Sequence, residues 1–283
     1  MLSSVDITII VPTCNRPMIL RQCLDSIKSQ TLEPSKVIVM DQSDDEDCIK
    51  VCRSYDVVYH HCEYKNKSKA INDAILMSDT SWLSIVDDDT VLASNWIEIV
   101  IQKRAKYPNV HIIQGSIYSS SGYDDANADI HTKEEIVNKR VITPLFLIGC
   151  NFAFSKSLYD RVGPFNEQLG PGTPNKGGED IEWGHRVLYE KNPLLICPDL
   201  KLIHQAWRTQ KDVISQMSNY GIAMAAVLKI LKSRCYIDFI FYYIKVLFWL
   251  DLEIVGAMIL RRKQIVDSHK AYRNNFKTSY KNS

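Results

Sequence analysis

The chain lacks an excess of charge of either sign: among its 283 residues, 34 are Lys or Arg and 33 are Asp or Glu, which leaves a net charge of +1. A nearly neutral chain has no global field that would attract nucleic acid, so no nucleic-acid partner is expected and any electrostatic function must be local. The 8 cysteines form no CxxC pair, and several lie in apolar stretches, where Cys behaves as a small hydrophobe. We therefore expect reduced thiols and a cytoplasmic protein.

Long uninterrupted hydrophobic runs are also missing. Residues 1–15 have no basic start and only a short apolar run, so they do not resemble a signal peptide and export is not expected. Residues 236–260 are very apolar, but Asp238, Lys245 and Asp251 interrupt them long before about 20 clean residues accumulate. This segment is a poor candidate for a membrane span.

Hydrophobic residues make up 46% of the whole sequence. In the first part of the chain, short apolar runs alternate with amphipathic ones. We expect strands at 6–12, 36–41, 57–61 and 82–89, with helices between them, and further strands at 110–118 and 145–155. This alternation predicts an α/β fold with a mostly parallel sheet and helices on both faces. The first strand runs into "PTCNRP" and not into a glycine fingerprint, which disfavours a Rossmann dehydrogenase.

A second part begins near residue 211, after which the pattern is wholly helical. We therefore divide the chain into an α/β domain at 1–210 and a helical region at 211–283 that ends in a basic tail. The segment 163–180 is rich in Gly and Pro, so it is not expected to be regular until a helix begins near Glu179.

Polar residues follow three of the expected strands: Thr13 to Arg16, Asp41, and Asp87 to Asp89. Because ligands of parallel sheets lie beyond the carboxyl ends of the strands, these residues should converge on one crevice. The three consecutive aspartates could form a turn and a helix cap. However, one aspartate suffices for a cap, and three adjacent carboxylates repel one another unless a hard cation such as Mg²⁺ or Mn²⁺ neutralises them.

Two metal-dependent chemistries fit such a strand end. The run "DDDTV" matches the signature of haloacid-dehalogenase phosphatases, with Asp87 as phosphoryl acceptor, although that family carries the motif on its first strand. The other chemistry is the transfer of a sugar from a nucleotide diphosphate. There the metal neutralises the departing phosphates, and the protein must supply a base for the acceptor hydroxyl.

Six segments of the chain together resemble the conserved parts of a known enzyme family. They are "ITIIVPTCNRPMILRQCLDSIKSQT", "KVIVMDQSDDE", "SKAINDAI", "WLSIVDDDTVL", "IGCNFAFSKSLYDRVGPFNEQLG" and "GGEDIEWGHRV". Occurring in this order over roughly residues 6–205, they resemble the family 2 glycosyltransferases, inverting enzymes of the GT-A fold, a Rossmann-like α/β architecture. The resemblance implies a nucleotide-sugar donor, with a UDP-sugar favoured, and a saccharide or lipid-linked saccharide acceptor in polysaccharide or glycoconjugate biosynthesis.

The same resemblance implies roles for individual residues. The nucleotide would be contacted by Pro12, Thr13, Asn15 and Asp41, with Asp88 directed to the ribose or the diphosphate. The cation, Mn²⁺ or Mg²⁺, would be held by Asp87, Asp89 and His204. A lone His at the end of an apolar run is more often structural, so His204 is the weaker of these ligands.

The segment "SKAIND" carries Ile71 where relatives often have Arg next to the Asn. Lys69 is expected to supply the missing phosphate-facing charge, with Lys67 and Lys65 as alternatives. Three lysines within five positions could equally form a solvated helix start.

The second strong motif is "GGED" at 177–180. Paired glycines allow a close backbone approach, while an acidic pair is also ordinary in the first turn of a helix. The resemblance implies that Asp180 is the catalytic base that takes the acceptor proton, with Glu179 holding sugar hydroxyls. Trp183 falls where the family shapes its acceptor site, and it could either stack on a sugar or belong to the core.

The C-terminal part combines an apolar helix with a basic end: residues 261–283 carry seven Lys and Arg and the single acid Asp267. This combination suits shallow docking of 236–283 on the inner face of the cell membrane. The alternative is packing on the catalytic domain or in a homodimer. The alternatives to a glycosyltransferase are the phosphatase and a catalytically silent, membrane-associated scaffold of the same fold.

Overall fold

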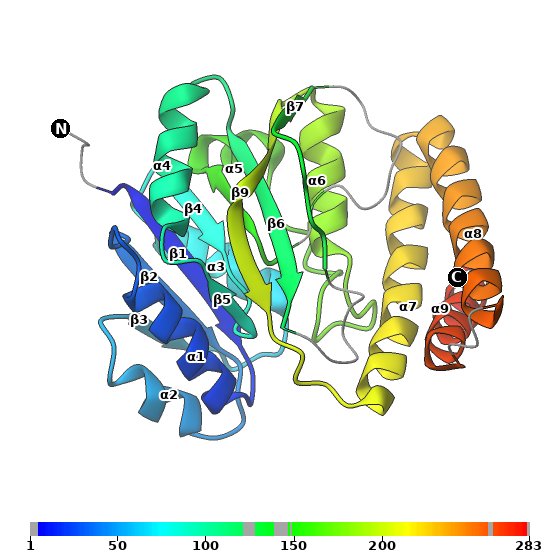
Figure 1. Ribbon diagram of the computed structural model, residues 1–283, viewed down its shortest axis with the longest axis horizontal. Helices are drawn as coiled ribbons and strands as arrows, with labels where there is room; N and C mark the ends of the chain where they lie inside the picture. Colours follow the sequence, from blue (N-terminus) through cyan, green and yellow to red (C-terminus); the bar gives the residue numbers. More distant parts are fainter. Residues whose placement is uncertain (1–4, 121–127, 139–146, 148, 260–262, 282–283) are drawn as a thin grey trace.

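The computed structural model describes residues 5–120, 128–138, 147, 149–259 and 263–281 (Figure 1). The first part of the chain contains β1 (Ile7–Thr13), α1 (Pro17–Lys28), β2 (Lys36–Asp41), α2 (Asp47–Cys52), β3 (Val58–His61), α3 (Lys67–Met77), β4 (Trp82–Ile85), β5 (Thr90–Leu92) and α4 (Trp96–Lys106). It continues with β6 (Ile112–Ser119), β7 (Glu135–Val137), β8 (Phe152–Ser155), α5 (Lys156–Val162), α6 (Glu179–Tyr189), β9 (Leu194–His204), α7 (Gln210–Arg234), α8 (Tyr236–Ile259) and α9 (Lys263–Lys281).

One sheet in the order β3-β2-β1-β4-β8-β6-β9-β5 forms the centre of the molecule, and β7 pairs with β9. Strands β1, β2, β3, β4, β6 and β9 run in one direction, and β5, β7 and β8 run in the other. The prediction of a mostly parallel α/β sheet is therefore confirmed.

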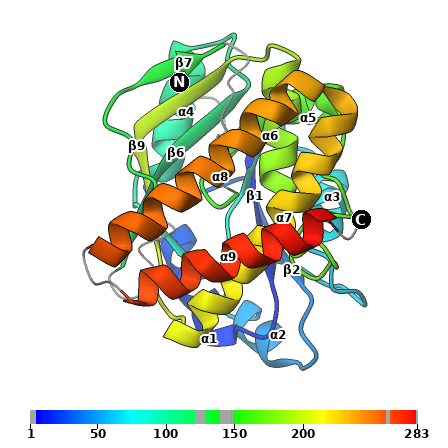
Figure 2. The same cartoon turned by 90° about the vertical axis from the view of Figure 1, so that its right-hand side faces the viewer.

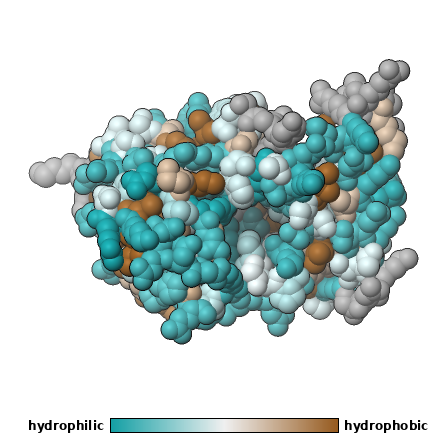
Figure 3. Space-filling model, turned by 90° about the horizontal axis from the view of Figure 1, so that it is seen from below, coloured by the Kyte–Doolittle hydropathy of each residue, from teal (hydrophilic) through white to brown (hydrophobic). Residues whose placement is uncertain are grey.

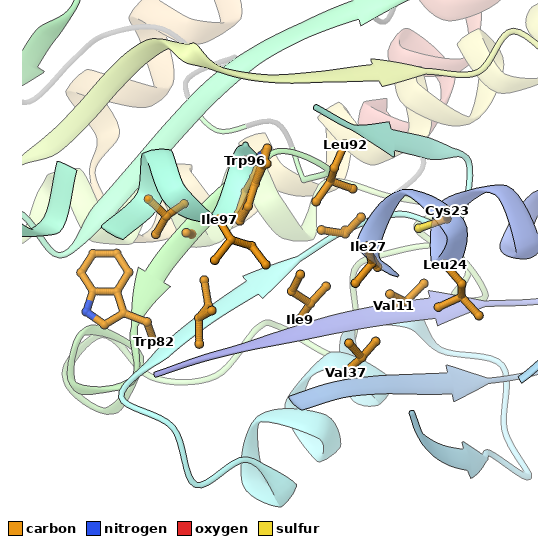
Figure 4. Packing of buried hydrophobic residues seen from close by; sticks show 14 of the residues in the cluster. Ile9, Val11, Cys23, Leu24, Ile27, Val37, Trp82, Leu92, Trp96 and Ile97 are labelled. Atoms are coloured by element: carbon orange, nitrogen blue, oxygen red, sulfur yellow. The ribbon is translucent and has the colours of Figure 1, made fainter. Parts of the chain in front are cut away.

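Helices cover both faces of this sheet. On one face, α1, α2 and α4 pack on side chains such as Ile9, Val11 and Trp82, as Figure 4 shows from close by. On the other face, α3, α5 and α6 pack on Ile10 and Ile38. Alternate residues of β1 thus enter opposite cores, which is why its sequence is an unbroken apolar run.

The three aspartates lie in the turn between β4 and β5, and not in a single long strand as expected for 82–89. Strand β4 ends at Ile85, and β5 then pairs antiparallel with β9, bringing Thr90 opposite His204. The sequence pattern missed this reversal because β5 is only three residues long.

The last three helices pack together against the sheet domain. Helix α7 lies between α6 and the pair α8 and α9 (Figures 1 and 2). The predicted basic tail forms helix α9, because Val266, Tyr272 and Phe276 give it a buried apolar face. Within the described part of the chain, none of the helices has the length and apolar character needed to cross a membrane.

Candidate active site

A cavity of about 520 Å³ opens where the parallel strands end. The face seen from below in Figure 3 is largely hydrophilic and is hollowed near its middle. The cavity wall combines the turn after β1, the aspartate turn after β4, the start of α6, the end of β9 and one side of α7. Among the predicted site residues, it is lined by Pro12, Thr13, Asp87, Asp89, Glu179, Asp180 and His204.

Asp89 is surrounded by positively charged groups and hydrogen-bond donors. Its Oδ2 accepts hydrogen bonds from Arg16 at 3.0 Å, Trp207 Nε1 at 2.9 Å and Arg208 at 3.2 Å. Its Oδ1 lies 3.4 Å from Nε2 of His204. Burial raises the pKa of Asp89, but these neighbours, His204 and Arg16 foremost, outweigh it and lower the pKa to about 2.

Asp88 is fully buried beneath the cavity wall. Thr13 donates to its Oδ2 at 2.6 Å, and the guanidinium of Arg16 lies 2.5 Å from its Oδ1. Because burial outweighs the attraction of Arg16, its pKa rises to about 7. The structure therefore places Asp88 where it fixes the turn after β1 against the aspartate turn, and it is not among the residues that line the cavity.

Lys67 joins the two acidic parts of the site. Its Nζ lies 2.7 Å from Asp87 Oδ1 and 3.6 Å from Glu179 Oε1. Burial lowers the pKa of Lys67, but these two carboxylates outweigh that effect and raise it. Lys67 is therefore a protonated cation between the aspartate turn and the start of α6.

Asp180 is held by two backbone donors. The amide of Gly149 donates to its Oδ2 at 2.7 Å, and the amide of Ile181 donates to its Oδ1 at 2.8 Å. Burial raises the pKa of Asp180. It also raises that of Glu179 to about 7, with the charge of Asp180 adding to the effect. A fixed carboxylate with a raised pKa suits proton abstraction near neutral pH.

The remaining nucleotide-side residues lie outside the cavity lining: Asp41 is buried, and Asn15 is exposed at the surface. The Oδ1 of Asp41 accepts from the backbone amide of Ser43 at 2.9 Å, and its Oδ2 accepts from the hydroxyl of Tyr59 at 2.8 Å. The side chain of Asn15 exchanges two hydrogen bonds with Asp44, each of 2.9 Å. Neither Asp41 nor Asn15 lines the cavity in this structure.

Lys69 is not brought to the cavity, whereas Lys67 and Lys65 line it. The Nζ of Lys69 pairs with Asp73 at 2.9 Å, one turn along α3. Two residues along a helix with 3.6 residues per turn point about 200° apart. Once Lys67 faces the cavity, Lys69 must therefore face away from it.

The paired glycines and Trp183 have structural roles. Gly178 precedes α6 with φ +86°, and a Cβ there would lie 2.7 Å from Val227 of α7. The close approach predicted for this pair is therefore an approach to α7 as well as to the cavity. Trp183 is fully buried among Phe152, Phe154 and Phe165, so it belongs to the core.

Sequence reasoning expected Arg16 near the crevice, but it did not predict that Arg16 and Arg208 neutralise the aspartate turn. Arg16 and Arg208 both lie over the ring of Trp207, with guanidinium carbons 5.2 and 4.5 Å from its centroid. A cluster of buried carboxylates requires nearby positive charge, and that requirement was the available signal. The polar side of α7, with Asp212, Ser215, Gln216, Asn219 and Tyr220, was also missed as a part of the cavity wall.

The donor set for a cation is partial. In the stretches that the structure describes, no three His, Cys, Asp or Glu side chains are grouped closely enough to hold a metal ion. Asp89 and His204 supply one carboxylate and one imidazole side by side, both of which are ordinary ligands of divalent transition metals.

Three glycan-synthesising proteins resemble this chain in sequence. It is 26% identical over 225 residues to chondroitin synthase of Pasteurella multocida, covering 65% of this chain and 23% of that protein. It is 22% identical over 215 residues to glycosyltransferase AglE of Haloferax volcanii, covering 71% of this chain and 67% of that protein. A third relative, glycosyltransferase GlyA of Streptococcus pneumoniae, is 27% identical over 118 residues, which are 40% of this chain and 17% of that protein. The chain thus spans less than a quarter of two of these relatives.

Solved structures show the same fold. The mannosyltransferase PcManGT of Pyrobaculum calidifontis, solved in complex with GDP-Man and Mn²⁺, superposes with a TM-score of 0.64 at 17% identity, covering 97% of this chain and 86% of that one. TarS of S. aureus superposes with a TM-score of 0.60 at 14% identity, covering 97% of this chain and 55% of that one. The predicted GT-A fold is confirmed.

A family model described as glycosyl transferase family 2 matches residues 8–163, which is more than half of the 283 residues. The match includes the turn after β1 and all three aspartates, so it assigns "DDDTV" to this family and speaks against the haloacid-dehalogenase alternative. The chain belongs to glycosyl transferase family 2.

Proposed function

We propose that the protein transfers a sugar from a nucleotide-diphosphate sugar to an acceptor hydroxyl, with inversion at the anomeric carbon. One observation carries the proposal: the Asp89–His204 pair and the fixed carboxylate of Asp180 lie on the wall of the same cavity. The arrangement provides one place for a charged leaving group and another for a proton acceptor. Family membership supports the same reaction class.

Asp180 acts as the base in this proposal. Its carboxylate accepts the proton of the acceptor hydroxyl as that oxygen attacks the anomeric carbon from the face opposite the leaving diphosphate. The amides of Gly149 and Ile181 keep the carboxylate from rotating. Glu179, beside it, holds a sugar hydroxyl, and Lys67 keeps Glu179 close to the aspartate turn.

A divalent cation, Mn²⁺ or Mg²⁺, would be held by Asp89 and His204, with Asp87 in the same cavity wall. It would compete with Arg16 and Arg208 for the carboxylate of Asp89. When bound, the cation would neutralise the departing diphosphate. The Mn²⁺ and GDP-Man found with PcManGT support this assignment.

The remaining details of the donor, the acceptor and the location are also proposals. A UDP-sugar remains the favoured donor, although PcManGT carries GDP-Man. The nucleotide would enter beside Pro12 and Thr13, and reaching Asp41 or Asp88 requires the hydrogen bonds around them to open. We expect a saccharide acceptor, free or linked to lipid, in polysaccharide or glycoconjugate synthesis. We also expect a cytoplasmic protein that either contacts the membrane peripherally through 236–283 or forms a homodimer.

A thermal-shift panel with UDP, GDP, dTDP and CMP, each with and without Mn²⁺, tests the proposal. We expect one diphosphate to raise the melting temperature, and Mn²⁺ to increase that rise. The matched control is Asp89→Asn, which removes a cation ligand and should abolish the part of the shift that depends on Mn²⁺. If no nucleotide stabilises the wild-type protein, the proposal is wrong and the catalytically silent scaffold is favoured.

A further inference from the structure

Helix α8 exposes a broad apolar face. Eight of its large apolar side chains are between 38% and 65% exposed. They are Tyr236, Ile237, Ile240, Phe241, Ile244, Phe248, Leu252 and Met258. Most recur three or four positions apart, which places them on one side of the helix. The opposite side, with Phe239, Tyr242 and Val246, is buried against α7 and α9.

A row of lysines runs along the neighbouring helix. Lys263, Lys270 and Lys277 of α9 are exposed, and a spacing of seven residues places them on one face of the helix. The buried face of α9, which includes Tyr272 and Phe276, packs on α7. Figure 2 shows α8 and α9 side by side in front of α7, so both helices lie on the same side of the molecule.

Such a surface is unusual for a protein that remains in water. Scattered exposed apolar side chains are normal, but a contiguous helix face of this kind marks an interaction site. A helix that is apolar nearly all round must be covered by protein or by lipid. No helix among the described residues can span a bilayer, so a lipid partner would have to lie against the side of α8.

We propose that the exposed faces of α8 and α9 dock on an anionic phospholipid surface. Helix α8 lies in the plane of the interface with Phe241, Ile244 and Phe248 among the acyl chains, while the lysine row of α9 faces the phosphate headgroups. Charge decides between lipid and a second copy of the chain. A two-fold dimer through this face must be self-complementary, so the lysines of one copy would have to meet acids of the other. The described acids of this face are Asp251, which is already paired with Arg273 at 2.9 Å, and Asp267. A dimer would therefore bring together more lysines than available acids.

Helix α7 separates the proposed docking face from the cavity. The side of α7 that faces away from α9 contributes Gln216, Asn219 and Tyr220 to the cavity wall. A docked molecule would therefore hold its cavity one helix away from the lipid surface. This position suits an acceptor carried by a membrane lipid, whereas docking itself does not depend on the transfer reaction.

Co-sedimentation of the full chain with vesicles tests the electrostatic part. We expect binding to vesicles of phosphatidylcholine mixed with phosphatidylglycerol, weaker binding at high salt, and little binding to phosphatidylcholine alone. Each lysine near an anionic surface raises the binding constant about five-fold. The triple variant Lys263→Gln, Lys270→Gln, Lys277→Gln should thus bind roughly 100-fold more weakly. The control changes three exposed lysines of the sheet domain, Lys28→Gln, Lys133→Gln and Lys201→Gln, and should bind as the wild type does.

A second pair of variants tests the apolar part. Phe241→Ser with Phe248→Ser should weaken vesicle binding roughly ten-fold or more. The matched control, Met18→Ser with Leu76→Ser, removes exposed apolar side chains from the sheet domain and should have no effect. All four positions are exposed, so circular dichroism and the melting temperature should be preserved.

Two results would overturn the proposal. The first is failure of the wild-type protein to sediment with anionic vesicles, or an equal loss in the control variants. The second is a dimer in light scattering that Phe241→Ser with Phe248→Ser converts to a monomer, which would show that a second copy covers this face. Vesicle binding with no nucleotide-dependent thermal shift would leave the docking surface established and the proposed transfer reaction wrong.

Discussion

Asp180, the proposed catalytic base, is held by two backbone hydrogen bonds. Asp180→Asn keeps the shape of the side chain but removes its ability to accept a proton. We expect the transfer rate to fall about 10²- to 10⁴-fold, with nucleotide and Mn²⁺ binding nearly unchanged in calorimetry. Wild-type turnover in Asp180→Asn would show that another group is the base.

The pH dependence follows from the direction of the Asp180 pKa shift. Only the deprotonated carboxylate is a base, so kcat/KM must fall as the pH drops through its pKa. Because burial raises that pKa above the ordinary value of 3.8, the acidic limb of the profile should lie above pH 3.8, and it should disappear in the residual activity of Asp180→Asn. An acidic limb at or below pH 3.8 would contradict the assignment.

Lys67 and Lys69 form a natural pair for comparison. Lys67→Met leaves Asp87 and Glu179 without their shared cation, and breaking a buried ion pair in this way should cost about 3 kcal/mol of unfolding free energy. Lys69→Met removes the partly exposed pair with Asp73 and the contact of its ammonium with the Tyr64 ring, and it should cost less than about 1 kcal/mol. Urea denaturation of both variants measures the difference, and equal losses would show that the Lys67 bridge has no special role.

At this scale the sequence predicted acids better than cations. Asp89 and Asp180 belong to recognisable motifs, and both line the cavity. Arg16 and Arg208 follow no motif, because a counter-charge can come from any segment that the fold brings near. Which lysine of α3 faces the cavity depends on the rotation of the helix about its axis, and a run of closely spaced lysines does not specify that rotation.

At the scale of elements, the close contact between α7 and α9 depends on one glycine. A Cβ at Gly221 would lie 2.2 Å from the carbonyl oxygen of Tyr272 and 3.0 Å from the backbone nitrogen of Phe276. Gly221→Ala should therefore push the two helices apart and cost about 1–3 kcal/mol, despite the better helix propensity of Ala. Urea unfolding and faster hydrogen exchange in α9 would report the change.

The exposed Ser233→Ala near the end of the same helix is the matched control, and it should change the stability by less than about 0.5 kcal/mol. A stabilised Gly221→Ala variant would mean that α9 adjusts without cost and that the helices are not closely packed in solution.

Elements with a strong hydrophobic pattern were predictable, whereas the very short strand β5 and the highly charged helix α9 were not. Strands β1 and β2 lie where the apolar runs predicted them, and α6 begins at the acidic pair, as predicted. Strand β5 has only three residues and is set by its pairing with β9. Helix α9 looked like a basic tail because its many charges conceal the few apolar residues that pack on α7.

At the scale of the whole molecule, the order of strands explains why distant motifs meet. Thr13 ends β1 opposite Asp41 of β2, and β4 lies on the other side of β1. The carboxyl ends of these neighbours form one edge of the sheet, which is why the turn after β1 and the aspartate turn share a cavity. The sequence predicted this convergence, but it did not predict that α7 closes the cavity from the side.

The position of α7 between the cavity and α9 has a consequence for how the shape of the cavity can vary. Its inner side touches whatever occupies the cavity, while its outer side rests on Tyr272 and Phe276 of α9. Repacking at α9 would thus move Asn219 and Tyr220 without altering the aspartate turn. Residues of α9 that never meet a ligand can then change the shape of the cavity on the α7 side, while the aspartate turn keeps its position.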